Sequence, residues 1–230
     1  MSLDKRAMAF PFSSPPALVI FDCDGVLVDS EPVANRLLVR VLAEEGFDIS
    51  YEECRRLFVG KTMNAVMAYV EEALGRPLGD HWPDYIRDET LKAFAAGVDA
   101  VPGVREVLLA LRLRAVPFCV ASSGKFEKMR FTLGSSGLLP LVENVLFSAE
   151  QVAHGKPWPD LFLFAAKEMG FAPQACVVIE DSVPGVQAAI AAGIPALGFA
   201  GDPHTDAAAL KSEGAHVFHD MSALPGLIGL

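Results

Sequence analysis

Short runs of apolar residues alternate along most of the chain with segments in which apolar residues recur every three or four positions. The uninterrupted runs are typical of strands buried on both faces of a parallel sheet, and they cover 17–21, 117–121, 145–147, 175–179 and 195–199. Helical spacing covers 104–113, 125–136, 161–169, 183–192, 205–213 and 222–227, with a possible edge strand at 216–218. This alternation predicts an α/β fold with a doubly wound parallel sheet.

One long stretch interrupts the alternation and shows only helical patterns. Its expected helices are 33–45, 51–59, 63–74 and 85–96, with Pro32 suited to a first helical turn and Gly46 to a helix end. We therefore predict an inserted all-helical domain at 33–97. An α/β core domain is expected from 17–32 together with 98–230, and a flexible tail from 1–16. The hinges are expected near 30–33, with support from Asp29 and Ser30, and near 97–102.

Polar side chains follow the predicted strands at the points where these strands end. They are Asp22, Asp24, Ser122, Glu180 and Asp181, with Lys156 in a nearby loop. Ligands bind outside the carboxyl ends of strands in open α/β sheets, so these groups should converge on one pocket. Carboxylates gathered in this way need a hard cation with oxygen ligands, and Mg²⁺ suits them best.

Each of these segments also has an ordinary structural explanation. Ser122-Ser123-Gly124 could be a helix-capping turn, and Lys156 a solvated loop lysine. Glu180-Asp181-Ser182 could cap a helix that begins at Val183. All of these explanations would have to hold at once, which favours one catalytic site over three unrelated caps and loops.

Composition and charge restrict the partners. The net charge is −10, with 29 acidic and 19 basic residues and no lysine or arginine run, which argues against nucleic acid and anionic membrane surfaces. No segment has the length of a membrane-spanning helix, and 1–16 lacks the apolar stretch of a signal peptide. Four cysteines without C-x-x-C spacing suit reduced thiols and a cytoplasmic location. Neither these cysteines nor the histidines show zinc spacing.

The strand-end residues, taken together, resemble a known family. Asp22-x-Asp24-Gly25, Ser122, Lys156-Pro157 and Glu180-Asp181 are similar, in this order, to the four motifs of the haloacid dehalogenase superfamily. The helical insert resembles the C1 cap of its β-phosphoglucomutase-like and phosphatase-like branch. The resemblance implies a Rossmann-like core with a helical cap.

The resemblance also implies roles for individual residues. Asp22 would be the nucleophile that forms an aspartyl-phosphate, and Asp24 would serve first as general acid and then as general base. Ser122 would donate to the phosphoryl oxygens, aided by the backbone N–H groups of Ser123 and Gly25, while Lys156 would balance charge. Mg²⁺ would be held by Asp22, the carbonyl of Asp24, and Asp181, with Glu180 reaching it through water.

The reaction is inferred from departures within the family. Haloalkanoic acid dehalogenases lack the second aspartate, so the presence of Asp24 disfavours dehalogenation. β-Phosphoglucomutases carry a histidine where this chain has Ala34 and a cap arginine where it has Met63. Both differences favour hydrolysis. We therefore expect a Mg²⁺-dependent phosphatase acting on a small phosphate monoester, a sugar or sugar-acid phosphate.

The alternatives are a phosphosugar mutase, a phosphoglycolate phosphatase and, as the weakest, a phosphate sensor without turnover. Lys61, Thr62 and Lys125 are the expected substrate contacts beyond the transferred phosphoryl group, because Gly60-Lys61-Thr62 resembles a cap specificity loop. The expected partner is a small phosphorylated metabolite, and the expected state is a monomer or a weak homo-oligomer.

Overall fold

The computed structural model describes residues 15–58 and 61–230, so the predicted tail lies almost wholly outside the described residues. Six strands form one parallel sheet in the order β5-β4-β1-β6-β7-β8. They are β1 (Leu18–Phe21), β4 (Phe118–Ser122), β5 (Leu146–Ser148), β6 (Cys176–Glu180), β7 (Ala196–Phe199) and β8 (His216–Phe218). The predicted doubly wound parallel sheet is confirmed.

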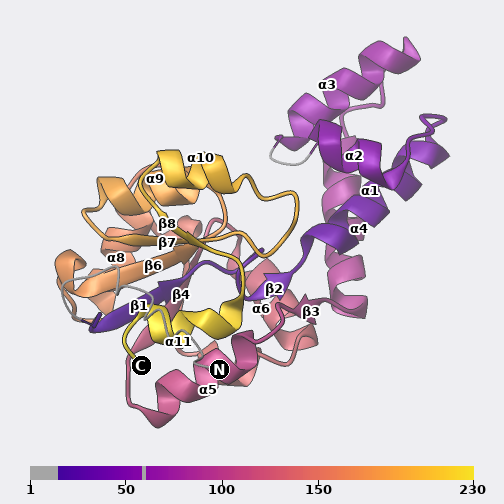
Figure 1. Ribbon diagram of the computed structural model, residues 1–230. Helices are drawn as coiled ribbons and strands as arrows, with labels where there is room; N and C mark the ends of the chain where they lie inside the picture. The colour runs from indigo at the N-terminus through magenta and orange to yellow at the C-terminus, as the bar shows by residue number, and fades with distance from the viewer. Residues whose placement is uncertain (1–14, 59–60) are drawn as a thin grey trace, which may run out of the picture.

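The sheet is buried on both faces because consecutive apolar side chains of each strand point to opposite sides. Val19 and Phe21 pack with helices α5 (Val104–Leu113), α6 (Phe126–Ser135) and α11 (Leu224–Leu227). Leu18 and Ile20 pack with α8 (Asp160–Glu168), α9 (Val183–Ala191) and α10 (Ala207–Ser212). Figure 1 shows α9 and α10 on one side of the sheet and α5 and α11 on the other. The core is therefore a three-layer α/β unit.

Four helices follow β1 and form a separate unit beside the sheet (Figure 1). They are α1 (Glu31–Glu44), α2 (Tyr51–Phe58), α3 (Met63–Leu74) and α4 (Trp82–Ala96). Their apolar faces gather in a cluster of their own, which includes Leu42, Val70 and Trp82. Because these helices have their own core, we propose that they are the inserted domain predicted at 33–97.

A two-stranded antiparallel ribbon joins the two units. Its strands are β2 (Val28–Asp29) and β3 (Asp99–Ala100), with Val28 opposite Ala100. The sequence pattern indicated hinges in these places but no strands, since a two-residue strand is too short to show periodicity.

The remaining differences concern short elements and helix ends. The helix predicted at 85–96 begins at Trp82, because Pro83 in its first turn needs no backbone hydrogen bond. The helix predicted at 222–227 divides into η3 (Met221–Ala223) and α11. The short elements α7 (Leu139–Val142), η1 (Ala149–Gln151) and η2 (Pro173–Ala175) were not predicted. Within the described part of the chain, we find no helix that is long and apolar enough to cross a membrane.

Candidate active site

The first two aspartates leave the sheet at the end of β1. The N–H of Asp22 continues the sheet pattern by donating to the Ile179 carbonyl at 2.9 Å, which fixes Asp22 beside β6. The chain then turns at Gly25, whose φ of +78° favours glycine. A Cβ at Gly25 would lie 2.0 Å from an Oδ of Asp181. The glycine therefore allows the loop after β1 to pack directly against the carboxylate that follows β6.

Lys156 connects the nucleophile candidate to β6. Its Nζ forms ion pairs with Asp22 and, at 2.7 Å, with Glu180. The side chain of Lys156 is only 4% exposed, so the charge has left water and is compensated by these two carboxylates. The predicted meeting of Asp22, Lys156 and Glu180 is thus present in the structure.

Glu180 has both carboxylate oxygens engaged by protein donors. Oε1 accepts from Lys156, while Oε2 accepts from the backbone N–H and the hydroxyl of Ser182, each at 2.8 Å. Gly185 packs so closely that a Cβ there would lie 1.8 Å from Oε1. These contacts suit Glu180 to hold Lys156 in place. The water-mediated metal contact expected of Glu180 stays a prediction.

Ser122 ends β4 and is 1% exposed. Its Oγ accepts from the N–H of Gly124 at 3.0 Å, which leaves the hydroxyl hydrogen available to a phosphoryl oxygen. Ser148 supports the turn by donating to the Gly124 carbonyl at 2.8 Å. The N–H of Gly25, also expected at the phosphoryl group, instead donates to the Val28 carbonyl at 2.8 Å. A phosphoryl contact from Gly25 would require that bond to be given up.

Burial and crowding of carboxylates change the proton affinities here. Burial, with repulsion from Glu180 and Asp24, raises the pKa of Asp22 to about 7, although Lys156 opposes the shift. Burial, with repulsion from Glu180 and Asp22, raises the pKa of Asp181 well above its usual range. Burial alone would lower the pKa of Lys156, but Asp22 and Glu180 outweigh it and raise that pKa. A bound cation would relieve the repulsion between Asp22 and Asp181.

The donor set fits Mg²⁺ better than a metal that needs an all-protein cage. Across residues 15–58 and 61–230, no three histidine, cysteine, aspartate or glutamate side chains form a group able to hold a metal. Mg²⁺ is usually held by only one or two carboxylates, with waters and substrate phosphate completing its octahedron. Asp22 and Asp181 could supply those carboxylates, with the Asp24 carbonyl as a third oxygen.

The carboxylate of Asp24 has other partners than the carboxylate of Asp22. Ser30 donates to Oδ1 at 2.6 Å, and the ammonium group of Lys128 lies 2.9 Å from Oδ2. From the sequence, only a hinge role is expected for Ser30, and Lys128 belongs to none of the motifs. The available signal was the spacing of Lys125 and Lys128, since residues three apart in a helical turn share a face.

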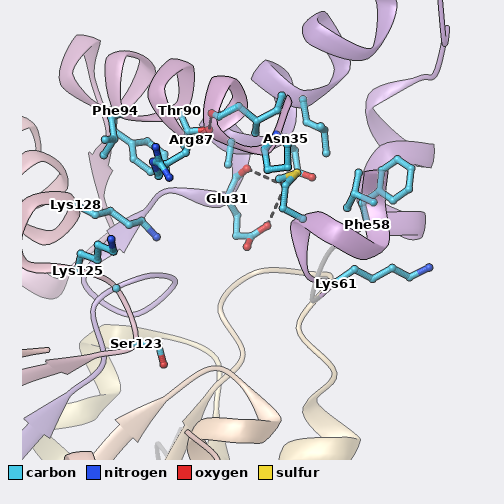
Figure 2. A pocket seen from close by; sticks show the side chains of 18 of the residues that line it. Glu31, Asn35, Phe58, Lys61, Arg87, Thr90, Phe94, Ser123, Lys125 and Lys128 are labelled. Carbon is cyan, nitrogen blue, oxygen red and sulfur yellow. Dashed lines mark hydrogen bonds between the residues drawn. The ribbon is translucent and has the colours of Figure 1, made fainter. Parts of the chain in front are cut away.

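A cavity of about 540 Å³ opens beside Asp24, between the helical unit and the core. Ser123, Lys125 and Lys128 line it from the core, and Lys61 lines it from the helical unit (Figure 2). The Nζ of Lys61 lies 5.8 Å from the ring centroid of Tyr69. Thr62 has a structural role, because it caps α3 by accepting from the N–H of Ala65. Thr62 is not among the described residues that line the cavity. Gly60, the first residue of the expected specificity loop, lies outside the described residues.

Known proteins are similar to this chain in sequence. The family model described as haloacid dehalogenase-like hydrolase matches residues 16–193. A 6-phosphogluconate phosphatase from Escherichia coli K12 is 33% identical over 81% of this chain and 83% of its own length. Hexitol phosphatase A from the same organism is 34% identical over 76% of this chain and 78% of its own length.

Solved structures agree with these relatives. A haloacid dehalogenase family hydrolase from Deinococcus radiodurans R1, solved with bound phosphate and sodium, has a TM-score of 0.83 and 35% identity, covering 94% of this chain and 97% of that one. A putative β-phosphoglucomutase from Thermotoga maritima has a TM-score of 0.80 and 28% identity, and the match covers 92% of this chain and 98% of that one. On the fold, the strand-end residues and these matches, the chain belongs to the haloacid dehalogenase-like hydrolase family and is an enzyme of the hydrolase class.

Proposed function

We propose that this enzyme is a Mg²⁺-dependent phosphatase that hydrolyses a small phosphate monoester, a sugar or sugar-acid phosphate, through an aspartyl-phosphate on Asp22. The observation that carries the proposal is the placement of the two aspartates at one strand end. Asp22 is held by buried Lys156, whereas Asp24 is held by Ser30 and by Lys128, which lines the cavity. One carboxylate is thus set for attack, while the other is set for proton transfer.

The chain's own groups account for the order of events. The Asp22 carboxylate attacks phosphorus, and the leaving oxygen takes a proton from Asp24, which then accepts a proton from the water that hydrolyses the acyl phosphate. Lys156 and the Ser122 hydroxyl stabilise the negative charge of the phosphoryl oxygens. Bound by Asp22, Asp181 and the Asp24 carbonyl, Mg²⁺ would supply further charge neutralisation.

The cavity supports a small substrate. Its volume of about 540 Å³ is typical of pockets for small metabolites. Lys61 and Lys125 line it from opposite units, which suits a substrate with polar or acidic groups beyond the phosphate. The names of the two Escherichia coli relatives, a 6-phosphogluconate phosphatase and a hexitol phosphatase, agree with a sugar or sugar-acid phosphate.

Mutase chemistry is the second candidate because of the similarity to a putative β-phosphoglucomutase. Ala34 and Met63, the positions expected to hold histidine and arginine in a mutase, both line the cavity. These side chains can neither hydrogen-bond nor pair with a second phosphate. The cavity therefore favours hydrolysis, with water accepting the phosphoryl group.

A substrate panel tests the proposal. Purified enzyme with Mg²⁺ should release inorganic phosphate from 6-phosphogluconate or a hexose or hexitol phosphate, and excess chelator should abolish the release. Asp22→Asn should lose activity, whereas Asp80→Asn, an exposed aspartate in the helical unit, should keep it. Full activity of Asp22→Asn would overturn the proposal. Interconversion of sugar phosphates without free phosphate would select the mutase instead.

A further inference from the structure

Lys128 touches the proposed acid–base group, the cavity and the helical unit at once. Its ammonium nitrogen lies 2.9 Å from Oδ2 of Asp24, across 104 positions of sequence. The same nitrogen lies 5.5 Å from the ring centroid of Phe94, near the end of α4. Both Lys128 and Phe94 line the cavity, and Figure 2 shows Lys128 extending into it from the core side.

These contacts distinguish Lys128 from an ordinary surface ion pair. The side chains of Lys128 and Asp24 are 32% and 28% exposed, so the pair is only partly withdrawn from water, and Lys128 itself lines the cavity. Ser30 holds the other oxygen of the same carboxylate at 2.6 Å. Two donors on opposite oxygens fix the rotation of a carboxylate, which a single donor would leave free.

We propose that Lys128 is a positioning residue for Asp24, an inference that rests on the proposed phosphatase function. By binding Oδ2 while Ser30 binds Oδ1, Lys128 sets the plane of the Asp24 carboxylate relative to the leaving oxygen. Lys128 also contacts Phe94 of helix α4. The same lysine therefore contacts both the helical unit and Asp24. No bond to the substrate is required of Lys128 in this role.

The expected size of the effect follows from proton transfer. A placed general acid contributes roughly 10²–10⁴-fold, and a displacement of about 1 Å can remove roughly 10²-fold. Lys128→Met should therefore lower kcat/KM for alkyl phosphates by about 30- to 100-fold. A nitrophenolate leaving group departs without needing a proton. The fall in kcat/KM for p-nitrophenyl phosphate should therefore be at least about tenfold smaller than the fall for alkyl phosphates.

The experiment compares three substrates in wild type, Lys128→Met and Lys128→Arg. The substrates are 6-phosphogluconate, glucose 6-phosphate and p-nitrophenyl phosphate, and Arg130→Met, an exposed residue of the same helix, is the matched control. Similar losses for the two sugar phosphates, a smaller loss for the nitrophenyl ester and partial recovery in Lys128→Arg support positioning. In an Asp24→Asn background, Lys128→Met should cost less than threefold further, since the group that it positions is gone.

Other outcomes overturn the inference. Equal losses for all three substrates would mean a general structural role, and a loss confined to 6-phosphogluconate would mean that Lys128 binds the sugar carboxylate. A full additional loss in the Asp24→Asn background would likewise refute positioning. A wild-type enzyme that releases no phosphate from any substrate would instead overturn the proposed function, and this inference with it.

Discussion

Replacing Glu180 by glutamine separates the two roles that can be given to this residue. The substitution keeps the shape of the side chain but removes its charge. In the structure, both oxygens of Glu180 accept from donors, namely Lys156 at 2.7 Å and two groups of Ser182 at 2.8 Å. A glutamine must turn its NH₂ group toward one of these donors, so one buried contact becomes repulsive.

The magnitude follows from the burial. Glu180 is 1% exposed and the Lys156 side chain 4%. Removing one partner of a buried pair costs about 3–5 kcal/mol, and we expect the lower end, about 3 kcal/mol, because Asp22 still compensates Lys156. For a chain of 230 residues, this loss lowers the Tm by about 6–12 °C.

The assay combines unfolding with metal titration. Tm is measured by calorimetry in chelator for wild type, Glu180→Gln and Glu168→Gln, an exposed glutamate at the end of α8 that serves as control. Mg²⁺ affinity is then measured by calorimetric titration. Anchoring of Lys156 predicts a large Tm loss with Mg²⁺ affinity changed less than about threefold, well under 1 kcal/mol. An unchanged Tm together with a tenfold weaker Mg²⁺ affinity would refute the reasoning and make Glu180 a metal-site residue.

Two further predictions concern the metal and the junction between the units. Burial and carboxylate repulsion raise the pKa of Asp22 to about 7 and also raise the pKa of Asp181. The stability that protonated Asp22 gives the metal-free fold is therefore fully present below about pH 4 and is lost as the pH rises through about 7. Saturating Mg²⁺ should therefore raise the Tm more at about pH 8 than at about pH 5.5, and equal shifts would contradict the ligand assignment. Arg55 is 7% exposed and lies 2.9 Å from Asp202 across the two units. Arg55→Met should lower the unfolding free energy by about 1–3 kcal/mol in urea, while exposed Arg56→Met should change it by less than about 0.5 kcal/mol. Equal effects would refute an ion pair between the helical unit and the core.

Uninterrupted apolar runs made the core predictable. Within the run at 17–21, Leu18–Phe21 form β1 and are fully buried, because no polar residue among them could face solvent. Strand ends then located Asp22, Ser122 and Glu180, since parallel strands bring their carboxyl ends to one edge whatever their separation in sequence. Both the fold class and the meeting of these candidate site residues therefore followed from local pattern and topology.

Contacts between the two units could not be predicted in the same way. Arg55 and Asp202 are 147 positions apart, and no periodicity marks either residue as a partner of the other. The pairing of Lys128 with Asp24 depends on how the first turn of α6 lies against the loop after β1. The donors to Glu180 could not be predicted for a related reason, because they depend on the packing of Gly185 and Ser182 around its carboxylate. Side-chain partners of this kind require the three-dimensional arrangement.

The central claim is that Asp22 carries the phosphoryl group during turnover, and direct trapping tests it. Enzyme mixed with a substrate and Mg²⁺ is quenched in acid, and borohydride then reduces any acyl phosphate to an alcohol. Peptide mass spectrometry should find residue 22 converted from aspartate to homoserine, with Asp24 and Asp181 unchanged. Phosphate release without modification of Asp22, or with modification of another carboxylate in its place, would contradict the proposed mechanism.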